Sequence, residues 1–435
     1  MQKVLYLGFV WPEPNSSAAG SRTMEFLRLF RQQNWQVIFA SAASLSEHRS
    51  DLAALGIEEK TIAINCDSFD VFLQAYQPDL VVFDRFFTEE QFGWRVAHYC
   101  PQALRVLDTC DLHSLREARQ QLLKHSMSTF AKEVERHQVP AVQADAATLY
   151  QWMADSDVAQ REIAAIYRCD LSLMISSFEM NLLCQYFSVP AFLLCHTHLM
   201  LVPEPDLALS FPYEKRQGFV SIGNFRHAPN WDAVLWLKHA IWPRLRQHLP
   251  AAQLHVYGAY PPPKAMRLHQ PEHGFHVRGW AENAQAVMAQ ARVCLAPLRF
   301  GAGLKGKLAD ALAAATPSVT SQIGIEGMCG DLPWGGLVAD ESEAFALAAA
   351  QLYQDQALWL RSQQQAQEIL QRYFDRQLNA QHFMQSLQLA REQQAQRRQQ
   401  NFTGAMLRHH LHKSTQYMSQ WISLKNQKTL SINAQ

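Results

Sequence analysis

The sequence predicts an α/β protein built from two doubly wound, Rossmann-like domains and a C-terminal helical extension. Two successive series of short apolar runs alternate with segments of helical periodicity, which is typical of parallel sheets covered on both faces. Prolines clustered between residues 202 and 217 separate the two series and indicate a linker. Beyond Glu343 the pattern is helical almost to Gln400. We therefore place domains at 1–205 and 206–375, a further helix at 376–395 and a basic tail at 396–435.

The first series predicts a sheet with inserted helices. Its strand candidates are residues 4–10, 37–40, 61–64, 80–83, 104–107, 171–175 and 191–194. Helical periodicity marks residues 21–33 and 88–99, and the long polar stretch 113–168 predicts one or two helices. The second series predicts strands at 219–222, 253–257, 275–277, 293–296 and 318–320.

Composition excludes several classes of protein. Lys and Arg total 39, as do Asp and Glu, so the neutral chain has no overall attraction for nucleic acid. No apolar run is long enough to predict a membrane-spanning helix. The 8 cysteines form no Cys-x-x-Cys pair, which favours reduced, buried side chains in a cytoplasmic protein and predicts no metal site.

The tail at 396–435 carries Lys and Arg but no acidic residue. It can be a membrane-surface or partner-binding helix, with weak peripheral contact at the inner face of a membrane. The alternative that we favour is a frayed terminal extension.

A glycine-rich loop follows the strand candidate 293–296 and leads into a helix. Gly301, Ala302 and Gly303 let backbone amides approach a ligand, and the N-terminus of the following helix favours an anion. Lys305 and Lys307 add two cations, so the segment predicts a phosphate or diphosphate site. The alternative is a glycine-rich turn with two surface lysines.

A second candidate phosphate site opens the second domain. The strand candidate 219–222 ends at Gly223 and Asn224, and a loop with Arg226 leads into a helix that begins near Pro229. Arg226 can pair with a phosphate in a bidentate manner, or it is a surface charge of the loop.

These pieces together resemble the donor-binding half of family 4 ("group 1") glycosyltransferases of the GT-B fold. The matching segments run in family order, as Gly223–Asn230, His255–Gly258, Val277–Trp280, Ala296–Lys307, Pro317–Thr320 and Gly324–Gly327. The resemblance implies two domains that face each other across a cleft, with a nucleotide-diphosphate sugar held by the second domain. It also implies retention of anomeric configuration, an acceptor on the first domain, and terminal helices that return to that domain.

By this resemblance, Arg226 and Lys305 neutralise the donor diphosphate, with Lys307 as a second candidate. Fixed cations of this kind make a metal unnecessary, and no other cofactor is implied. Asp310 stands at the family's second glutamate, whereas Ala302 replaces the first, which leaves the sugar without its usual acid. Glu326 can contact the donor instead, or it is a surface acid.

Three parts of the first domain are candidates for the acceptor side. The loop at Gly20 and Ser21 resembles the family's opening loop, although Ser21 as a helix cap also explains it. His113 follows the strand candidate 104–107 and can contact the sugar or the acceptor, with Asp108 and Asp111 orienting its ring. Asp84 is a further cleft candidate.

The sequence therefore predicts a cytoplasmic glycosyltransferase that acts on a glycan or lipid-linked glycan, as in polysaccharide biosynthesis. Two alternatives stay open: a nucleotide-sugar epimerase on the same fold, and an inactive module that binds a nucleotide or glycan.

Overall fold

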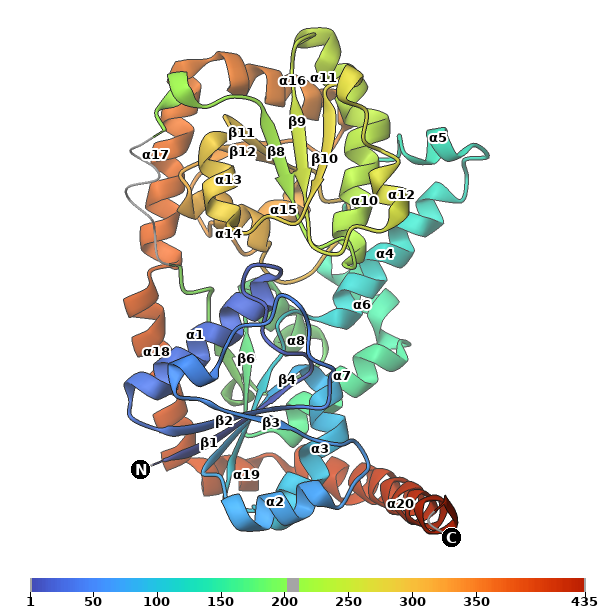
Figure 1. Cartoon of the computed structure of the whole chain (residues 1–435), viewed down its shortest axis with the longest axis vertical. Helices are drawn as coiled ribbons and strands as arrows, with labels where there is room; N and C mark the ends of the chain where they lie inside the picture. Colours follow the sequence, from blue (N-terminus) through green and yellow to red (C-terminus); the bar gives the residue numbers. More distant parts are fainter. Residues whose placement is uncertain (1, 202–210, 434–435) are drawn as a thin grey trace.

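The computed structural model describes residues 2–201 and 211–433, and shows two parallel sheets, each with helices on both faces (Figure 1). The first sheet has the order β3-β2-β1-β4-β5-β6-β7. Its strands are β1 (Lys3–Gly8), β2 (Gln36–Ser41), β3 (Glu58–Thr61), β4 (Leu80–Asp84), β5 (Leu104–Asp108), β6 (Leu171–Met174) and β7 (Leu194–His196). The helices are α1 (Ala18–Gln32), α2 (Ser68–Tyr76), α3 (Arg85–Tyr99), α4 (His113–Met127), α5 (Glu133–Arg136), α6 (Ala146–Ala154), α7 (Asp157–Arg168) and α8 (Ser177–Tyr186).

The second sheet has the order β10-β9-β8-β11-β12-β13. Its strands are β8 (Phe219–Ile222), β9 (Leu254–Tyr257), β10 (Phe275–Gly279), β11 (Val293–Ala296), β12 (Ser318–Thr320) and β13 (Gly336–Val338). The helices are α10 (Ala228–Trp236), α11 (Trp242–His248), α12 (Pro263–Met266), α13 (Ala284–Gln290), α14 (Gly306–Ala313), α15 (Gln322–Ile325), α16 (Ser342–Gln354) and α17 (Gln356–Tyr373).

Continuous apolar strands form because both faces of each sheet are buried. In β1, Leu5 and Leu7 enter one core cluster of the first domain, while Val4 and Tyr6 enter the cluster on the opposite face. Alternate side chains of a strand point to opposite faces, so helices must cover both. The predicted GT-B-like architecture of two doubly wound domains is confirmed.

Several predicted elements differ from the structure. The third strand is β3 at Glu58–Thr61 rather than at 61–64; it is an edge strand with little apolar signal. Residues Ala191–Leu193 form a 3₁₀ turn after Pro190, so β7 begins only at Leu194. The stretch 113–168 contains four helices, and β13 was not predicted. The predicted domain boundary at 205/206 lies outside the described residues.

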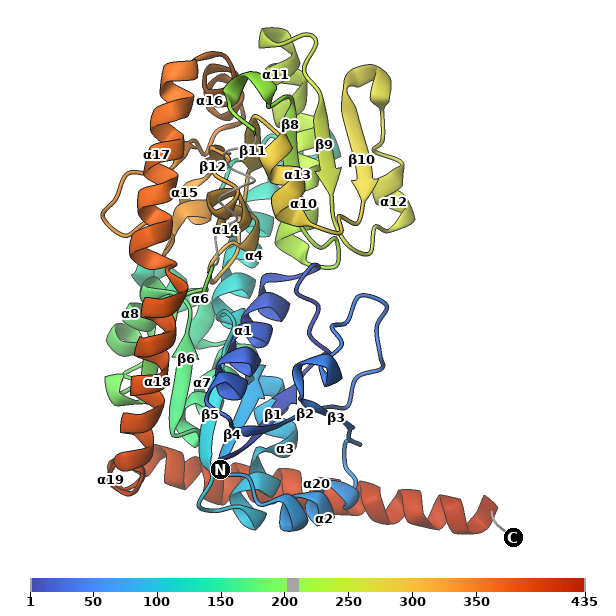
Figure 2. The same ribbon diagram turned by 60° about the vertical axis from the view of Figure 1, so that its left-hand side comes forward.

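The chain returns from the second domain to the first through α18 (Arg376–Glu392) and α19 (Gln394–Gln400). Figure 2 shows α17 and α18 running along one side of both domains. Phe383 of α18 packs against Phe26 of α1, with ring centroids 4.6 Å apart. On α19, Arg398 pairs with the buried Asp170 at 2.7 Å. These contacts fix the end of the chain to the first domain.

The expectation of a frayed tail is wrong. Residues Phe402–Asn433 form a long helix, α20, which packs on α3 and α7 of the first domain (Figure 1). Nowhere in the described part of the chain does a helix combine the length and apolarity that crossing a membrane requires.

Candidate functional site

The candidate site lies where the domains meet, between loops that follow strands of both sheets. Gly303, after β11, donates its backbone N–H to Glu179 of α8 at 2.7 Å. Tyr260, after β9, donates its hydroxyl to Glu13, after β1, at 2.8 Å. Ligands of open parallel sheets bind beyond the carboxyl ends of the strands. Both sets of loops are therefore placed to hold one ligand between them.

The glycine-rich loop packs directly against the first domain. Gly303 has φ +62°, and a Cβ there would fall 2.8 Å from the Cβ of Asp111. Both the left-handed backbone and this close approach require glycine. Ala302 packs against the apolar core of the first domain. The position at which the resembling family has an acid is therefore apolar here.

Glu179 brings a carboxylate to this loop from the first domain. Its Oε1 accepts the backbone N–H groups of Gly303 and Leu112, the latter at 3.2 Å. Within the described residues its buried Oε2 has no hydrogen-bond partner. Burial and the nearby Asp111 raise the pKa of Glu179. Glu179 thus brings an acid from the first domain beside the glycine-rich loop, in which Ala302 stands where the family that the sequence resembles has an acid.

Asp111 lies at the start of α4 among basic side chains. Its carboxylate pairs with Arg116 and lies 3.4 Å from Nε2 of His113. Burial alone would raise the pKa of Asp111, but Arg116, His113, His227 and Arg85 hold it well below the usual range. Burial lowers the pKa of His113 to about 4, so its ring is neutral at pH 7.

His227 joins this group from the second domain, at the start of α10. The side chain of His227 is exposed, and partial desolvation together with the charge of Arg116 lowers its pKa; Lys307 and Arg85 act in the same direction. Arg116 and His113 therefore contact the carboxylate of Asp111, while Arg85 and, from the second domain, His227 act on it electrostatically.

The two other aspartates proposed for the first domain belong to its framework. Asp108 is fully buried and accepts from Nε of Arg22 at 2.9 Å, so it does not orient His113 as we expected. Asp84 accepts from the backbone N–H of Phe9 at 3.1 Å and from Sγ of Cys110 at 3.4 Å. Asp84 therefore holds the ends of neighbouring strands together.

The two lysines of the glycine-rich segment have different surroundings. Nζ of Lys305 donates to the carbonyl oxygen of Gly303 at 2.6 Å, and burial lowers its pKa. Lys307 is 9% exposed, and within the described part of the chain it makes no hydrogen bond or ion pair. Burial lowers the pKa of Lys307 to about 8 and raises that of Asp310, one turn later on α14, to about 7. Lys307 is thus the lysine left available for an anion.

Arg226 lies on the outer side of the loop after β8. It is exposed, and its guanidinium carbon lies 3.7 Å from the centroid of the Tyr260 ring. Oδ1 of Asn224 accepts the backbone N–H of Arg226 at 2.9 Å. Gly223 packs so closely on Asn230 that a Cβ would fall 2.6 Å from Cγ of that residue. The loop is therefore shaped by its own contacts, and the Arg226 side chain stacks on Tyr260.

Glu326 forms an ion pair across the two domains. Both of its oxygens accept from Arg119 of α4, at 2.9 and 2.6 Å. Nη1 of Arg119 also donates to the carbonyl oxygen of Gly301 at 2.8 Å. One first-domain side chain therefore binds both the glycine-rich loop and the loop that follows α15.

The opening loop of the first domain uses its polar groups internally. Ser17, not Ser21, caps α1, because its hydroxyl accepts the backbone N–H of Gly20 at 3.0 Å. The hydroxyl of Ser21 donates to the carbonyl oxygen of Pro14 at 2.8 Å. A Cβ on Gly20 would clash with the backbone of Glu13. The backbone amide of Gly20 is therefore already bonded within the loop.

Sequence reasoning assigned no site role to Arg116, Arg119, Glu179 or His227. Arg116 and His227 lie close in sequence to the predicted site residues His113 and Arg226. Their positions after strand candidates could therefore have indicated a place in the site. Glu179 follows the strand candidate 171–175, where the start of a helix suffices to explain it, and Arg119 lies in a polar helical stretch with no distinguishing spacing.

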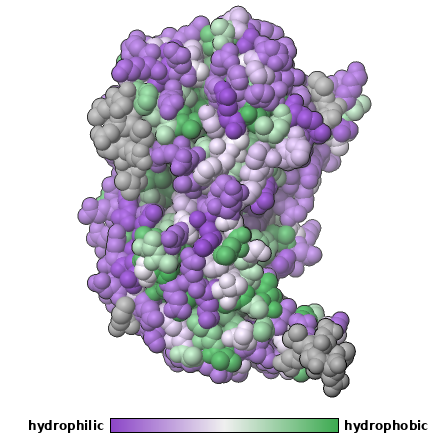
Figure 3. Space-filling model, in the orientation of Figure 1, coloured by the Kyte–Doolittle hydropathy of each residue, from purple (hydrophilic) through white to green (hydrophobic). Residues whose placement is uncertain are grey.

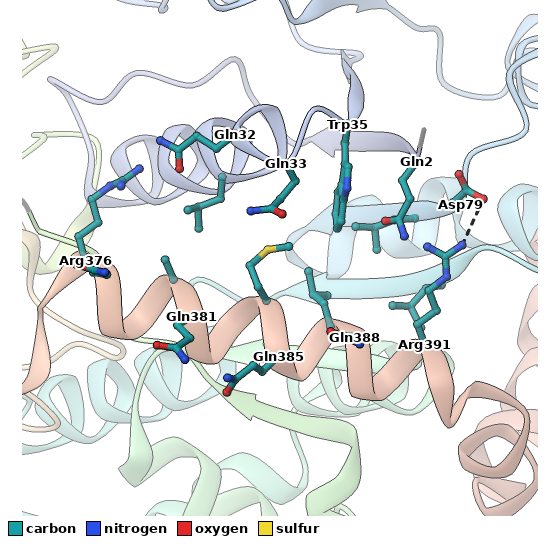
Figure 4. A pocket seen from close by; sticks show the side chains of 17 residues that line it. Gln2, Gln32, Gln33, Trp35, Asp79, Arg376, Gln381, Gln385, Gln388 and Arg391 are labelled. Carbon is teal, nitrogen blue, oxygen red and sulfur yellow. Dashed lines mark ion pairs between the residues drawn. The ribbon is translucent and has the colours of Figure 1, made fainter.

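A separate cavity of about 610 Å³ lies away from these loops, between α1 and α18 (Figure 4). Trp35 and several glutamines of both helices line it, and Arg391 pairs with Asp79 at its edge at 3.6 Å.

Comparison with known proteins agrees with this geometry. Residues 216–355 match the family model described as glycosyl transferases group 1. No curated protein sequence matches the chain.

Several solved structures are similar to this chain over most of its length. Sucrose-phosphate synthase from Thermosynechococcus elongatus is 14% identical, with a TM-score of 0.60 over 91% of this chain and 100% of that one. Anabaena HepE in complex with UDP and glucose is 13% identical, with a TM-score of 0.61 over 89% and 100%. A S. aureus TarM mutant in complex with fondaparinux, alpha-GlcNAc-glycerol and UDP is 9% identical, with a TM-score of 0.64 over 89% and 99%.

The fold is that of the GT-B glycosyltransferases, and the match of residues 216–355 to the group 1 family model supports a transferase. More particularly, the match to the group 1 model falls in the second domain, where the sequence motifs predicted it.

Proposed function

We propose that this protein moves a sugar, with retention of configuration, from a nucleotide-diphosphate sugar to a glycan or lipid-linked glycan. The observation that carries the proposal is the group of basic side chains from both domains at the glycine-rich loop. A departing nucleotide diphosphate develops negative charge, which fixed cations and helix N-termini stabilise. The HepE and TarM structures, both complexes with UDP, support a nucleotide donor.

Lys307 is the first candidate for the donor diphosphate. It stands in the first turn of α14, where the helix dipole also favours an anion. Its ammonium group has no other partner among the described residues, whereas that of Lys305 is bonded to Gly303. We therefore assign Lys305 to holding the loop and Lys307 to the diphosphate, with Arg226 at the outer side.

The sugar would lie between the glycine-rich loop and His113. A neutral His113 can donate a hydrogen bond to a sugar hydroxyl or accept one from it. Asp111, which pairs with Arg116, lies beside the His113 ring. In a retaining transfer the leaving diphosphate can take the acceptor proton, so no separate base is needed. Glu179 binds the backbone amide of Gly303, so this amide holds the loop in place and, contrary to what we expected, is not available to the donor. Asp310 is the candidate for the donor ribose.

The test is nucleotide-sugar binding by the full chain, measured by calorimetry with UDP-, GDP-, ADP- and CMP-sugars. We expect one base to be selected, and Lys307→Ala to weaken that binding while Lys215→Ala, an exposed lysine of the same domain, does not. NMR of the product's anomeric proton then tests retention. Equal binding by wild type and Lys307→Ala would refute the assigned site. An epimeric nucleotide sugar formed without acceptor would identify an epimerase instead.

A further inference from the structure

Helix α20 lies on the first domain through a polar face. The residues of this face follow one another at helical spacing and are Gln416, Ser419, Gln420 and Ser423. Ser419 accepts from Nη2 of the buried Arg95 at 2.9 Å, and Ser423 donates to the carbonyl oxygen of Asn65 at 2.5 Å. Both serine side chains are buried. The contact between α20 and the first domain is therefore made by hydrogen bonds.

The opposite face of α20 is apolar and points to solvent. Tyr417, Met418, Trp421 and Leu424 are each about 60% exposed. Their spacing places them on one side of the helix, about half a turn away from Ser419 and Ser423. Nζ of Lys425 lies 5.4 Å from the centroid of the Trp421 ring, on the same side.

This arrangement is the reverse of an ordinary surface helix, which turns its apolar side to the core. Four large apolar or aromatic side chains on one exposed stripe are typical of a surface that binds a protein, a membrane or a ligand. Figure 2 shows α20 crossing the end of the first domain that lies away from the second domain, and extending beyond the body of the protein. In Figure 3, hydrophobic residues are also visible on this lower part of the molecule.

The positive charge around the apolar face of α20 indicates which kind of partner it binds. No acidic residue follows Glu392 in the sequence, and Lys413 and Lys425 are exposed beside the apolar stripe. A second copy of α20 would bring these lysines against like charges. An anionic lipid surface would pair with them and accept the Trp and Tyr rings at the level of its headgroups.

We propose that α20 is an interfacial helix that docks the first domain on an anionic lipid surface. Tyr417, Met418, Trp421 and Leu424 enter the headgroup region, while Lys413 and Lys425 contact lipid phosphates. The polar face at Ser419 and Ser423 keeps the helix on the protein. This inference needs no catalysis, so it stands or falls separately from the proposed transferase site.

The experiment is co-sedimentation of the full chain with vesicles. One set contains equal amounts of phosphatidylglycerol and phosphatidylcholine, and the other contains phosphatidylcholine alone. The apolar variant is Trp421→Ser with Leu424→Ser, and the charge variant is Lys413→Glu with Lys425→Glu. The matched control is Leu378→Ser with Leu389→Ser, which removes two exposed leucines from α18. Circular dichroism verifies that each variant retains its helix content.

We expect the wild type and the α18 control to bind anionic vesicles and to bind neutral vesicles weakly. Each α20 variant should lose about tenfold or more in partition coefficient, because it removes two apolar side chains that enter the lipid or reverses two charges. Added salt should weaken the binding. Equal binding by the variants, or no binding by the wild type, would overturn the proposal. So would a dimer, seen by light scattering, that the apolar variant abolishes.

Discussion

Replacing Lys307 with methionine should stabilise the protein while it weakens donor binding. The side chain is 9% exposed, and burial lowers its pKa from 10.5 to about 8. Holding the lysine charged in this environment costs folding free energy of about 3 kcal/mol at neutral pH. Methionine has a similar length and no charge, so Lys307→Met should recover up to this amount. For a domain of the size of the second one, each kcal/mol gained in the free energy of unfolding raises Tm by roughly 2–4 °C.

The pH dependence gives the effect a definite sign. Well below pH 8 the lysine is protonated in both states, so the full cost is present in the folded protein. Between pH 8 and 10.5 the folded protein releases the proton that the unfolded chain keeps, and the cost disappears. The Tm difference between Lys307→Met and wild type should therefore be largest at or below pH 7 and vanish near pH 10.5.

The assay is thermal unfolding followed by scanning fluorimetry across this pH range, with nucleotide titrations in parallel. Loss of a charge-assisted hydrogen bond to phosphate should weaken nucleotide binding by about 10- to 100-fold. Lys215→Met, at an exposed position, should leave both Tm and affinity unchanged. A Tm for Lys307→Met that equals the wild type at pH 7 would refute the argument, because the buried cation would then carry no cost.

Three further outcomes follow from the site. Arg119→Ala leaves Glu326 and the carbonyl of Gly301 unpaired, which should lower the free energy of unfolding by about 3–5 kcal/mol. Arg119→Lys should not restore this stability, because lysine cannot form two parallel hydrogen bonds to a carboxylate. Glu162→Ala removes three hydrogen bonds to the first turn of α4, at 2.8, 3.1 and 2.6 Å, and should lower stability by about 1–2 kcal/mol; unchanged thermal unfolding would contradict this. EDTA should leave sugar transfer unchanged if Lys307 and its neighbours supply the charge, and loss of turnover that Mg²⁺ restores would show otherwise.

The strands of both sheets were readable from the sequence because their apolar runs are continuous. Residues 219–222, 293–296 and 318–320 were predicted with the bounds observed for β8, β11 and β12. A strand buried on both faces is apolar at most positions, and a polar side chain there, such as Asp108 of β5, is paired. The edge strand β3 lacks this constraint and was misplaced.

The residues of the site were predicted less well, because their roles depend on partners far along the chain. Lys305 and Lys307 are equally good candidates for an anion when judged by sequence alone. Only the tertiary structure shows that Lys305 is bonded to Gly303 while Lys307 is not. The pairing of Arg119 with Glu326 joins residues 207 positions apart, for which local periodicity carries no signal.

The polarity of α20 shows the same division. The sequence by itself determined an acid-free, helix-compatible tail with apolar residues at regular intervals. It did not determine which side of the helix meets the protein. The tertiary structure decided this: the buried guanidinium of Arg95, which forms an ion pair with Asp70, also donates a hydrogen bond to Ser419 of α20. The apolar side of α20 is left facing outward as a result.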